Sequence, residues 1–176
     1  MRNFFDVIFT RHEPVRGLAE HGKSALGAVA AILLISWLAQ LTELPMLLAP
    51  LGATAVILFG YPGGTLAQPL NIFGSYLIAT IIGVTTAMVA PTHWWLVAPA
   101  VGLVLFLMQT LRVTHPPAGA IPIVALLSPD DSATLFVTLL VGCVAMVALA
   151  LVWHYLPPRR RYPAEHPGVP VQEPEK

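Results

Sequence analysis

The chain of 176 residues carries little charge: Asp, Glu, Lys and Arg together make up 10% of it, against about a quarter in a typical soluble domain. Between Ser24 and Pro158 the charged residues are Glu43, Arg112 and the pair 130–131. Hydrophobic residues account for 56% of the chain, and its mean hydropathy is +0.75. This pattern excludes a soluble globular domain and predicts an integral membrane protein whose main partner is the lipid bilayer.

Other absences narrow the function. The chain has one cysteine, Cys143, so neither a disulfide framework nor a thiolate metal site is expected. The apolar stretches hold no carboxylate pair, metal-ligand spacing or nucleophile–base arrangement, so we expect no enzymatic activity, no cofactor and no metal. A net charge of zero without a basic aromatic patch gives no indication of nucleic-acid binding.

The lengths of the apolar stretches predict how the chain is arranged in the membrane. A full transmembrane helix takes about 20 mostly apolar residues. Four apolar stretches approach this length. Two further stretches are shorter and interrupted by Pro and Gly, and such segments either cross the membrane inside a bundle or re-enter on the same side. The sequence predicts an all-α, polytopic transmembrane bundle with four long spans and two short broken segments. The long spans are 24–41, 72–90, 94–111 and 133–156, and the short segments are 46–60 and 116–127.

Basic residues stand at both ends of the apolar region and favour the cytoplasmic side. We therefore expect a protein of the bacterial inner membrane with both termini in the cytoplasm. The predicted parts are an N-terminal segment 1–23, a membrane domain 24–156, and a flexible, Pro-rich basic tail 157–176.

Two cytoplasmic termini require an even number of crossings. If the short segments cross, Glu43 and the pair 130–131 face outside, while Arg112 faces the cytoplasm. If both segments re-enter, four helices cross and Arg112 lies on the outer side. We favour six membrane segments.

The two short segments resemble each other. LAPLGATAVIL (48–58) aligns with HPPAGAIPIVA (115–125), and each follows one long apolar stretch and precedes another. With three segments per half, the second half would enter from the opposite side, which makes an inverted repeat of the kind common in secondary transporters. The alternative is chance recurrence of Pro-x-Gly-Ala in an Ala- and Gly-rich chain. The paired residues are Pro50 with Pro117, Gly52 with Gly119 and Ala53 with Ala120.

Proline in the first turn suits a helix start. Pro50 and Pro117 are predicted to begin short helices, and Thr114 is the expected N-cap of the second. The exposed N–H groups of such helix starts attract anions, and Gly52 and Gly119 would let a ligand reach the backbone. Equally, these small residues would serve close helix packing.

Several polar residues near these helix starts have two interpretations each. Arg112 is either a functional cation or a headgroup anchor. His115 is as well suited to orient a neighbour as to carry a proton. The amides of Gln68 and Asn71 would either face a ligand or cap a helix near Leu70, and we favour capping for Asn71.

Three motifs in order, APLGATAVILFG (49–60), LAQPLNIFG (66–74) and THPPAGA (114–120), resemble the His-Pro-Pro (HPP) family of integral membrane proteins, over roughly residues 20–156. The resemblance implies a transport function, because plastid and cyanobacterial members are associated with nitrite transport. Many bacterial members have no assigned substrate. The family pattern has arginine after Gln-Pro where this chain has Leu70, which weakens the implication of nitrite.

The sequence thus predicts a small transporter or channel-like permease for a small anion, with nitrite the leading candidate, working as a homodimer or homotrimer. The alternative is a structural or sensory membrane subunit that acts with a partner protein. The predicted structural prolines are Pro50, Pro69, Pro116 and Pro117. The predicted substrate-binding residues are Gly52, Ala53, Thr54, Gln68, Asn71, Arg112, Thr114, His115 and Gly119.

Overall fold

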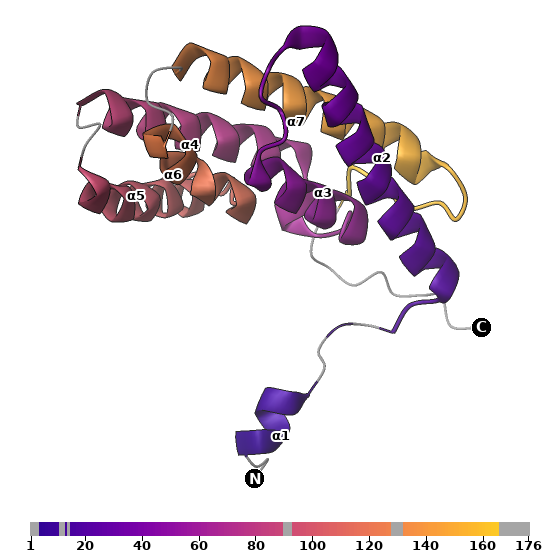
Figure 1. The fold of residues 1–176 in the computed structure, drawn as a ribbon. Helices are drawn as coiled ribbons and strands as arrows, with labels where there is room; N and C mark the ends of the chain where they lie inside the picture. The colour runs from indigo at the N-terminus through magenta and orange to yellow at the C-terminus, as the bar shows by residue number, and fades with distance from the viewer. Residues whose placement is uncertain (1–3, 11–12, 14, 90–92, 128–131, 166–176) are drawn as a thin grey trace.

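Helices make up most of the described chain, as the sequence predicts. The structure is a computed structural model that describes residues 4–10, 13, 15–89, 93–127 and 132–165, and none of these residues forms a β-strand (Figure 1). Short 3-10 helices η1 (Thr65–Ala67), η2 (Trp94–Leu96) and η3 (Pro116–Ala120) precede α4, α5 and α6. The α-helices are α1 (Phe4–Phe9), α2 (Leu18–Thr42), α3 (Ala49–Gly60), α4 (Pro69–Val89), α5 (Val97–Thr110), α6 (Ile121–Leu127) and α7 (Ser132–Tyr155).

Three helices, α2, α4 and α7, are long and apolar enough to cross a membrane. The expected fourth long span, 94–111, is shorter: it opens with the 3-10 turn η2, and α5 has 14 residues. Pro99 explains this, because it lacks the N–H that would bond the carbonyl of Trp95 in a regular α-helix. The predicted outer pair 130–131 lies outside the described residues.

The helix α4 lies at the centre of the bundle and packs against α5, α6 and α7. The helix α2 packs against α3 and α7, α3 also contacts α7, and α5 contacts α6. Exchanging α2, α3 and α4 with α5, α6 and α7 leaves this set of neighbours unchanged. The contact of α2 with α3 then corresponds to the contact of α5 with α6. In the same way, the contact of α4 with α6 corresponds to that of α7 with α3, and the contact of α4 with α5 to that of α7 with α2.

Glycines on the long helices make room for the short ones. A Cβ added at Gly83 of α4 would lie 3.0 Å from the Cα of Pro122, the second residue of α6. At Gly142 of α7 it would lie 2.8 Å from the Cδ1 of Leu51 in α3. Such close approach maximises van der Waals contact between helices in an apolar environment.

Two non-glycine residues of the described chain have positive φ, Glu43 (59°) and Arg112 (58°). Both lie in the left-handed region, which often ends a helix. Glu43 directly follows α2 and leads to α3, while Arg112 lies just after α5 and leads to η3. The chain therefore enters both short helices through the same unusual backbone conformation.

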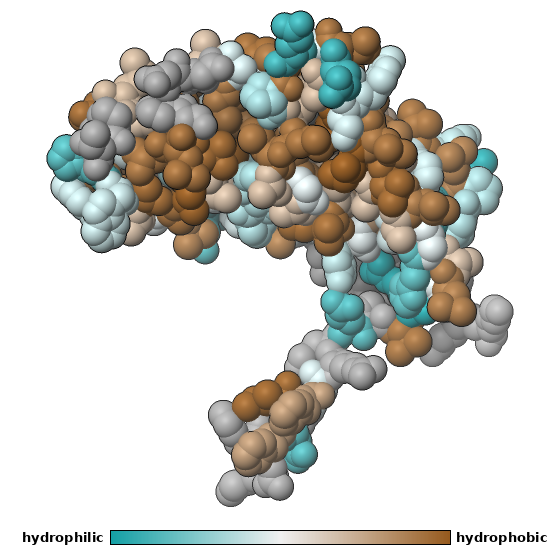
Figure 2. Space-filling view, viewed as in Figure 1, coloured by the Kyte–Doolittle hydropathy of each residue, from teal (hydrophilic) through white to brown (hydrophobic). Residues whose placement is uncertain are grey.

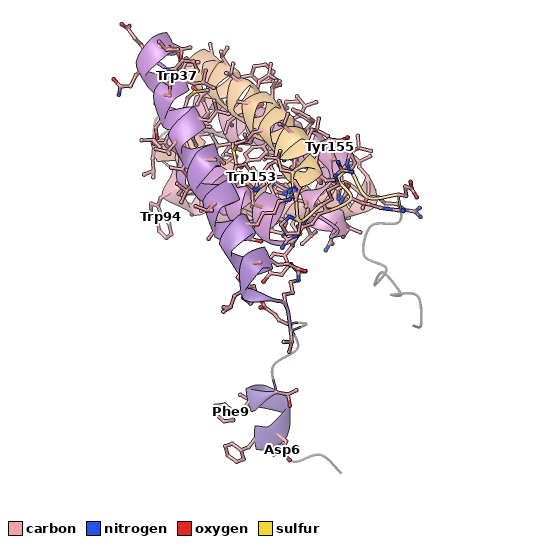
Figure 3. The ribbon with its side chains drawn as sticks, turned by 90° about the vertical axis from the view of Figure 1, so that its right-hand side faces the viewer. Asp6, Phe9, Trp37, Trp94, Trp153 and Tyr155 are labelled. Atoms are coloured by element: carbon pink, nitrogen blue, oxygen red, sulfur yellow. The ribbon has the colours of Figure 1, made fainter. Side chains whose placement is uncertain are left out.

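The outer surface of the bundle is mostly apolar. Figure 2 shows hydrophobic side chains over most of the visible face, with hydrophilic ones toward its margins. The short helix α1, which carries Asp6 and Phe9, lies apart from the bundle (Figures 1 and 3), and the Phe9 side chain is exposed. An apolar exterior of this extent is what a bilayer requires.

One end of the bundle, here called the basic end, gathers Arg16, Lys23 and the arginines 159–161. Arg16 Nη1 donates to the Gly60 carbonyl (2.9 Å), and Lys23 Nζ donates to the carbonyl oxygens of Leu156 and Pro158. These bonds tie the segment before α2 to the end of α3, and α2 itself to the residues that follow α7.

The chain after α7 continues to pack on the basic end. Arg160 donates to Ser24 Oγ (2.9 Å), and the Tyr162 hydroxyl donates to the Ala67 carbonyl (3.0 Å). Burial raises the pKa of the Tyr162 phenol, so it stays a neutral donor. Although the sequence predicts a flexible tail from residue 157, residues 157–165 are held against the bundle, and the remainder lies outside the described residues.

Candidate functional site

A buried polar cluster joins the two halves of the bundle. It consists of Thr54 on α3, Tyr76 on α4 and His115 just before η3, and their exposed fractions are 0%, 3% and 0%. Thr54 Oγ1 lies 2.8 Å from both the Tyr76 hydroxyl and His115 Nε2. His115 Nδ1 lies 2.6 Å from the Leu66 carbonyl oxygen.

The partners fix how the neutral ring of His115 is protonated. A carbonyl oxygen only accepts, so Nδ1 carries the proton and donates to Leu66. Nε2 then accepts from the Thr54 hydroxyl, which in turn accepts from Tyr76. If the ring gained a proton at Nε2, this N–H would donate a hydrogen bond to Thr54 Oγ1. The Thr54 hydroxyl would then donate to the Pro50 carbonyl, which lies 3.0 Å from Oγ1. The cluster therefore satisfies both forms of His115 without leaving a donor unpaired.

Two polar side chains of α4 hold the segment that leads to η3. Asn71 Nδ2 donates to the Thr114 carbonyl (3.0 Å), and the Ser75 hydroxyl is hydrogen-bonded to the Val113 carbonyl. Gly74 lies between them, where a Cβ would come within 3.1 Å of the Val113 side chain. The backbone just before His115 is thus bound to α4 at two consecutive residues, Val113 and Thr114.

The prolines of the helix starts lie where the sequence predicts. Pro50 is in the first turn of α3, Pro116 and Pro117 begin η3, and Pro69 is the first residue of α4. The expected Thr114 N-cap is wrong, because the N-cap residue is His115 and its side chain makes no cap bond. The ring of His115 is instead directed to Leu66 and Thr54.

The two amide side chains are engaged within the protein. Asn71 lies inside α4 and bonds Thr114, so the capping role favoured for it is wrong. Gln68 Nε2 donates to the carbonyls of Pro62 (3.0 Å) and Gly64 (2.8 Å), and its Oε1 accepts from the Ala164 N–H (2.9 Å). Gln68 therefore links the α3–α4 loop to the chain after α7.

The remaining predicted residues lie away from the cluster's hydrogen bonds. Arg112 is exposed, and its guanidinium has no hydrogen bond or ion pair to any residue that the structure describes. A Cβ added at Gly52 or Gly119 would meet nothing within 4 Å, so close packing does not require glycine at either position. Ala53 is exposed beside Gly52.

The space beside the cluster is small. A cavity of about 40 Å³ lies between α4 and α7, next to Tyr76 and Cys143. It is large enough for water. In the described residues, no three His, Cys, Asp or Glu side chains come together to hold a metal ion. The cluster is thus a closed hydrogen-bonded junction in this conformation.

Sequence reasoning did not find Tyr76 and Ser75, which lie within the apolar stretch 72–90. A helical spacing gives the signal: Asn71, Ser75 and, one position on, Tyr76 fall on one side of α4. Polar residues on a single face of a membrane helix indicate the side that is turned to the protein interior.

Comparison with known proteins shows which family has these motifs. A family model described as "HPP, transmembrane region" matches residues 13–163. The chain belongs to this HPP transmembrane family. The three motifs that suggested the family contain most of the site residues, including Thr54, Asn71 and His115.

Two relatives are transmembrane proteins of Dictyostelium discoideum. One is 29% identical over 165 residues, which cover 87% of this chain and 58% of the relative. The other is 30% identical over 163 residues, 85% of this chain and 52% of the relative. The chain thus spans little more than half the length of these relatives. No solved structure matches it.

Proposed function

We propose that this HPP protein is a small permease for a small anion, with nitrite the first substrate to test. The observation that carries the proposal is the completely buried polar cluster of Thr54, Tyr76 and His115 at the junction of two short, Pro-initiated segments. Ionisable and polar groups are costly inside a membrane protein, and they commonly mark transport pathways.

The two halves are proposed to form an inverted repeat. Two observations support this: the neighbours of each helix are preserved when the halves are exchanged, and the chain enters α3 and η3 through left-handed Glu43 and Arg112. Many secondary transporters move such halves against each other around a site between them. Because the space beside the cluster is only about 40 Å³, passage of an anion requires the short segments to shift.

The proposed anion path passes the starts of the short helices. Gly52 and Gly119 have open space at their Cβ positions, so an anion could reach the backbone there. Arg112, exposed near the start of η3, supplies positive charge on the approach. The transfer requires no covalent chemistry, so the protein is proposed not to be an enzyme.

Orientation and assembly are part of the proposal. The basic end faces the cytoplasm under the positive-inside rule, which puts both ends of the membrane domain on that side of what would be a bacterial inner membrane. Three long and three shorter segments enclose little interior, and Gly52, Ala53 and Gly119 are at least partly exposed. We therefore propose a homodimer or homotrimer, which native mass spectrometry in mild detergent would detect.

Flux into liposomes tests the function. The purified protein should release nitrite down its gradient, and a panel with nitrate, chloride and formate would define the selectivity. Gly119→Val should block flux by bulk while the protein stays folded. Gly102→Val is the matched control, since Gly102 on α5 also has nothing within 4 Å of a Cβ but lies outside the motifs.

The outcome separates the two candidate functions. If no anion in the panel moves although the protein is folded and inserted, the permease proposal fails. The subunit function would then be favoured, and a partner protein should restore activity. If Gly119→Val and Gly102→Val transport equally well, the path does not pass Gly119.

A further inference from the structure

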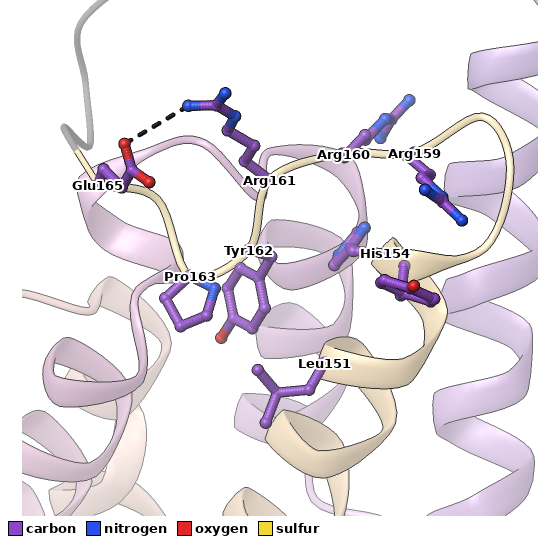
Figure 4. Close-up of a pocket in the computed structure, with 9 residues that line it drawn as sticks. Leu151, His154, Arg159, Arg160, Arg161, Tyr162, Pro163 and Glu165 are labelled. Atoms are coloured by element: carbon purple, nitrogen blue, oxygen red, sulfur yellow. Dashed lines mark hydrogen bonds and ion pairs between the residues drawn. The ribbon is translucent and has the colours of Figure 1, made fainter.

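A cavity lies at the basic end of the described structure, away from the polar cluster. Its volume is about 640 Å³, and it opens between the last turn of α7 and the chain that folds back after it (Figure 4). Its walls are unusual for a protein with so few charges, because they contain three consecutive arginines, Arg159, Arg160 and Arg161, against one carboxylate, Glu165.

Two of these arginines are held less firmly by the fold than the third. Arg160 is committed to the fold, because it bonds Ser24 and forms an ion pair with Glu20 (3.4 Å). Arg161 makes a solvent-exposed pair with Glu165 at 3.4 Å, whose side chains are 83% and 75% exposed. Exposed pairs of this kind are weak and easily exchanged. Arg159 stacks on the Tyr155 ring, 4.6 Å from its centroid.

The inner wall carries an unsatisfied polar atom. His154 is 1% exposed and lines the cavity. Its Nε2 lies 3.0 Å from the Leu58 carbonyl, so the proton of the neutral ring is on Nε2. Nδ1 is buried and has no hydrogen-bond partner in the part of the chain that the structure describes. Buried polar atoms normally have partners, but Nδ1 is shielded from the cavity, so a ligand bound there does not supply one.

The surroundings of the cavity are apolar on the membrane side. Leu151, which lines it, is 44% exposed, and the neighbouring Val152 and Tyr155 on α7 are 64% and 68% exposed. A ligand with a charged head at the arginines can therefore lay an apolar part along α7. Arginine suits phosphate in particular, since its planar fork donates two parallel hydrogen bonds to two oxygens.

We propose that this cavity binds a phosphate group, and that its source is an anionic phospholipid such as phosphatidylglycerol. Arg159 and Arg161 hold the phosphate, and the acyl chains follow the exposed face of α7. The bound lipid thereby fastens the chain after α7 to the membrane surface.

Binding of defined lipids to the full-length, delipidated protein in detergent tests this. We expect one phosphatidylglycerol to remain bound per chain in native mass spectrometry, and phosphatidylcholine to bind at least about tenfold more weakly. The double variant Arg159→Gln/Arg161→Gln should weaken phosphatidylglycerol binding about tenfold or more, and the corresponding Lys variant should retain part of it. Arg112→Gln removes one exposed positive charge outside the cavity and should change binding less than about twofold.

Other results would overturn the proposal. Equal binding by wild type and the double Gln variant, with both folded by circular dichroism and size exclusion, would show that the cavity holds no phosphate. Equal binding of phosphatidylcholine would show that the negative charge is not recognised. Inorganic phosphate or glycerol phosphate that displaces the lipid at an equal concentration would identify a site for a free phosphate compound instead of a lipid.

Discussion

Thr54 Oγ1 lies 2.8 Å from His115 Nε2, across 61 positions of sequence, and this bond joins the first short helix to the start of the second. The same hydroxyl lies 2.8 Å from the Tyr76 hydroxyl of α4. A single, fully buried threonine thus connects three segments of the bundle. Any movement of the short helices relative to each other must break or exchange these bonds.

The first prediction concerns this threonine. Thr54→Val keeps the shape of the side chain but removes the hydroxyl, so Tyr76 and His115 each lose a buried partner. We expect the free energy of unfolding to fall by about 1–3 kcal/mol for each group left unpaired. Unfolding by sodium dodecyl sulfate in mixed micelles measures the loss. Thr54→Ser retains the hydroxyl and is the control; an equal loss in both variants would mean that the bonds contribute nothing.

The second prediction compares two glycines. In Gly83→Ala the new methyl would lie 3.0 Å from the backbone of Pro122, which cannot move without shifting α6. Overpacking of this kind costs about 1–3 kcal/mol. In Gly52→Ala the methyl meets nothing within 4 Å, and alanine is the better helix former, so stability should be unchanged or rise by up to about 1 kcal/mol. Thermal unfolding of both variants in the same detergent measures the difference in stability. Equal losses of stability in the two variants would contradict the packing of Gly83 against Pro122.

Much of the fold follows from composition. The scarcity of charge between Ser24 and Pro158 predicts membrane helices, and Pro50 and Pro117 correctly mark the starts of α3 and η3. The fourth long span was overestimated, because hydropathy alone does not register the missing N–H of Pro99. Hydropathy reports which residues avoid water, whereas the end of a helix depends on individual backbone bonds.

The site was only partly predictable for a similar reason. The motifs include Thr54 and His115, but their direct bond depends on how α3 meets η3, which no local pattern gives. Tyr76 was missed because one hydroxyl among many apolar residues hardly alters hydropathy. The sequence leaves both ligand approach and close helix packing open for Gly52 and Gly119. In the structure, close approaches occur instead at glycines of the long helices such as Gly83 and Gly142. Such complementarity between distant segments is decided by the packed structure.

The third prediction concerns the chain after α7. Arg160 has bonds to Ser24 and Glu20, whereas the Arg161 side chain has, among the described residues, a single ion pair with the exposed Glu165. Arg160→Gln should therefore release the segment, and amide hydrogen exchange over residues 160–165 should become about tenfold faster, as the loss of about 1.4 kcal/mol of local stability implies. Arg161→Gln removes the same charge and should leave exchange nearly unchanged. Similar exchange in the two variants would show that Arg160 does not hold the segment.

The fourth prediction concerns the backbone at Glu43. A residue with a side chain in the left-handed region costs about 1 kcal/mol relative to glycine, and a β-branched residue costs more. Glu43→Gly should therefore preserve or raise the thermal stability, and Glu43→Val should lower it. If the order were reversed, the side chain of Glu43 would matter more than its φ of 59°.

The last prediction concerns Arg112, where backbone and side chain have separate roles. Its φ of 58° makes glycine acceptable to the fold, so Arg112→Gly should be at least as stable as the wild type. If the guanidinium supplies charge to an approaching anion, Arg112→Gly and Arg112→Gln should both lower nitrite flux into liposomes. Arg112→Lys should keep part of the flux, because it retains the charge but loses the planar fork. The loss should shrink at high salt, since the charge is exposed and screened within about 10 Å at 0.1 M ionic strength. Flux from Arg112→Gln with the wild-type rate and concentration dependence would mean that the arginine is a headgroup anchor. The path would then depend on the helix starts and the buried cluster alone.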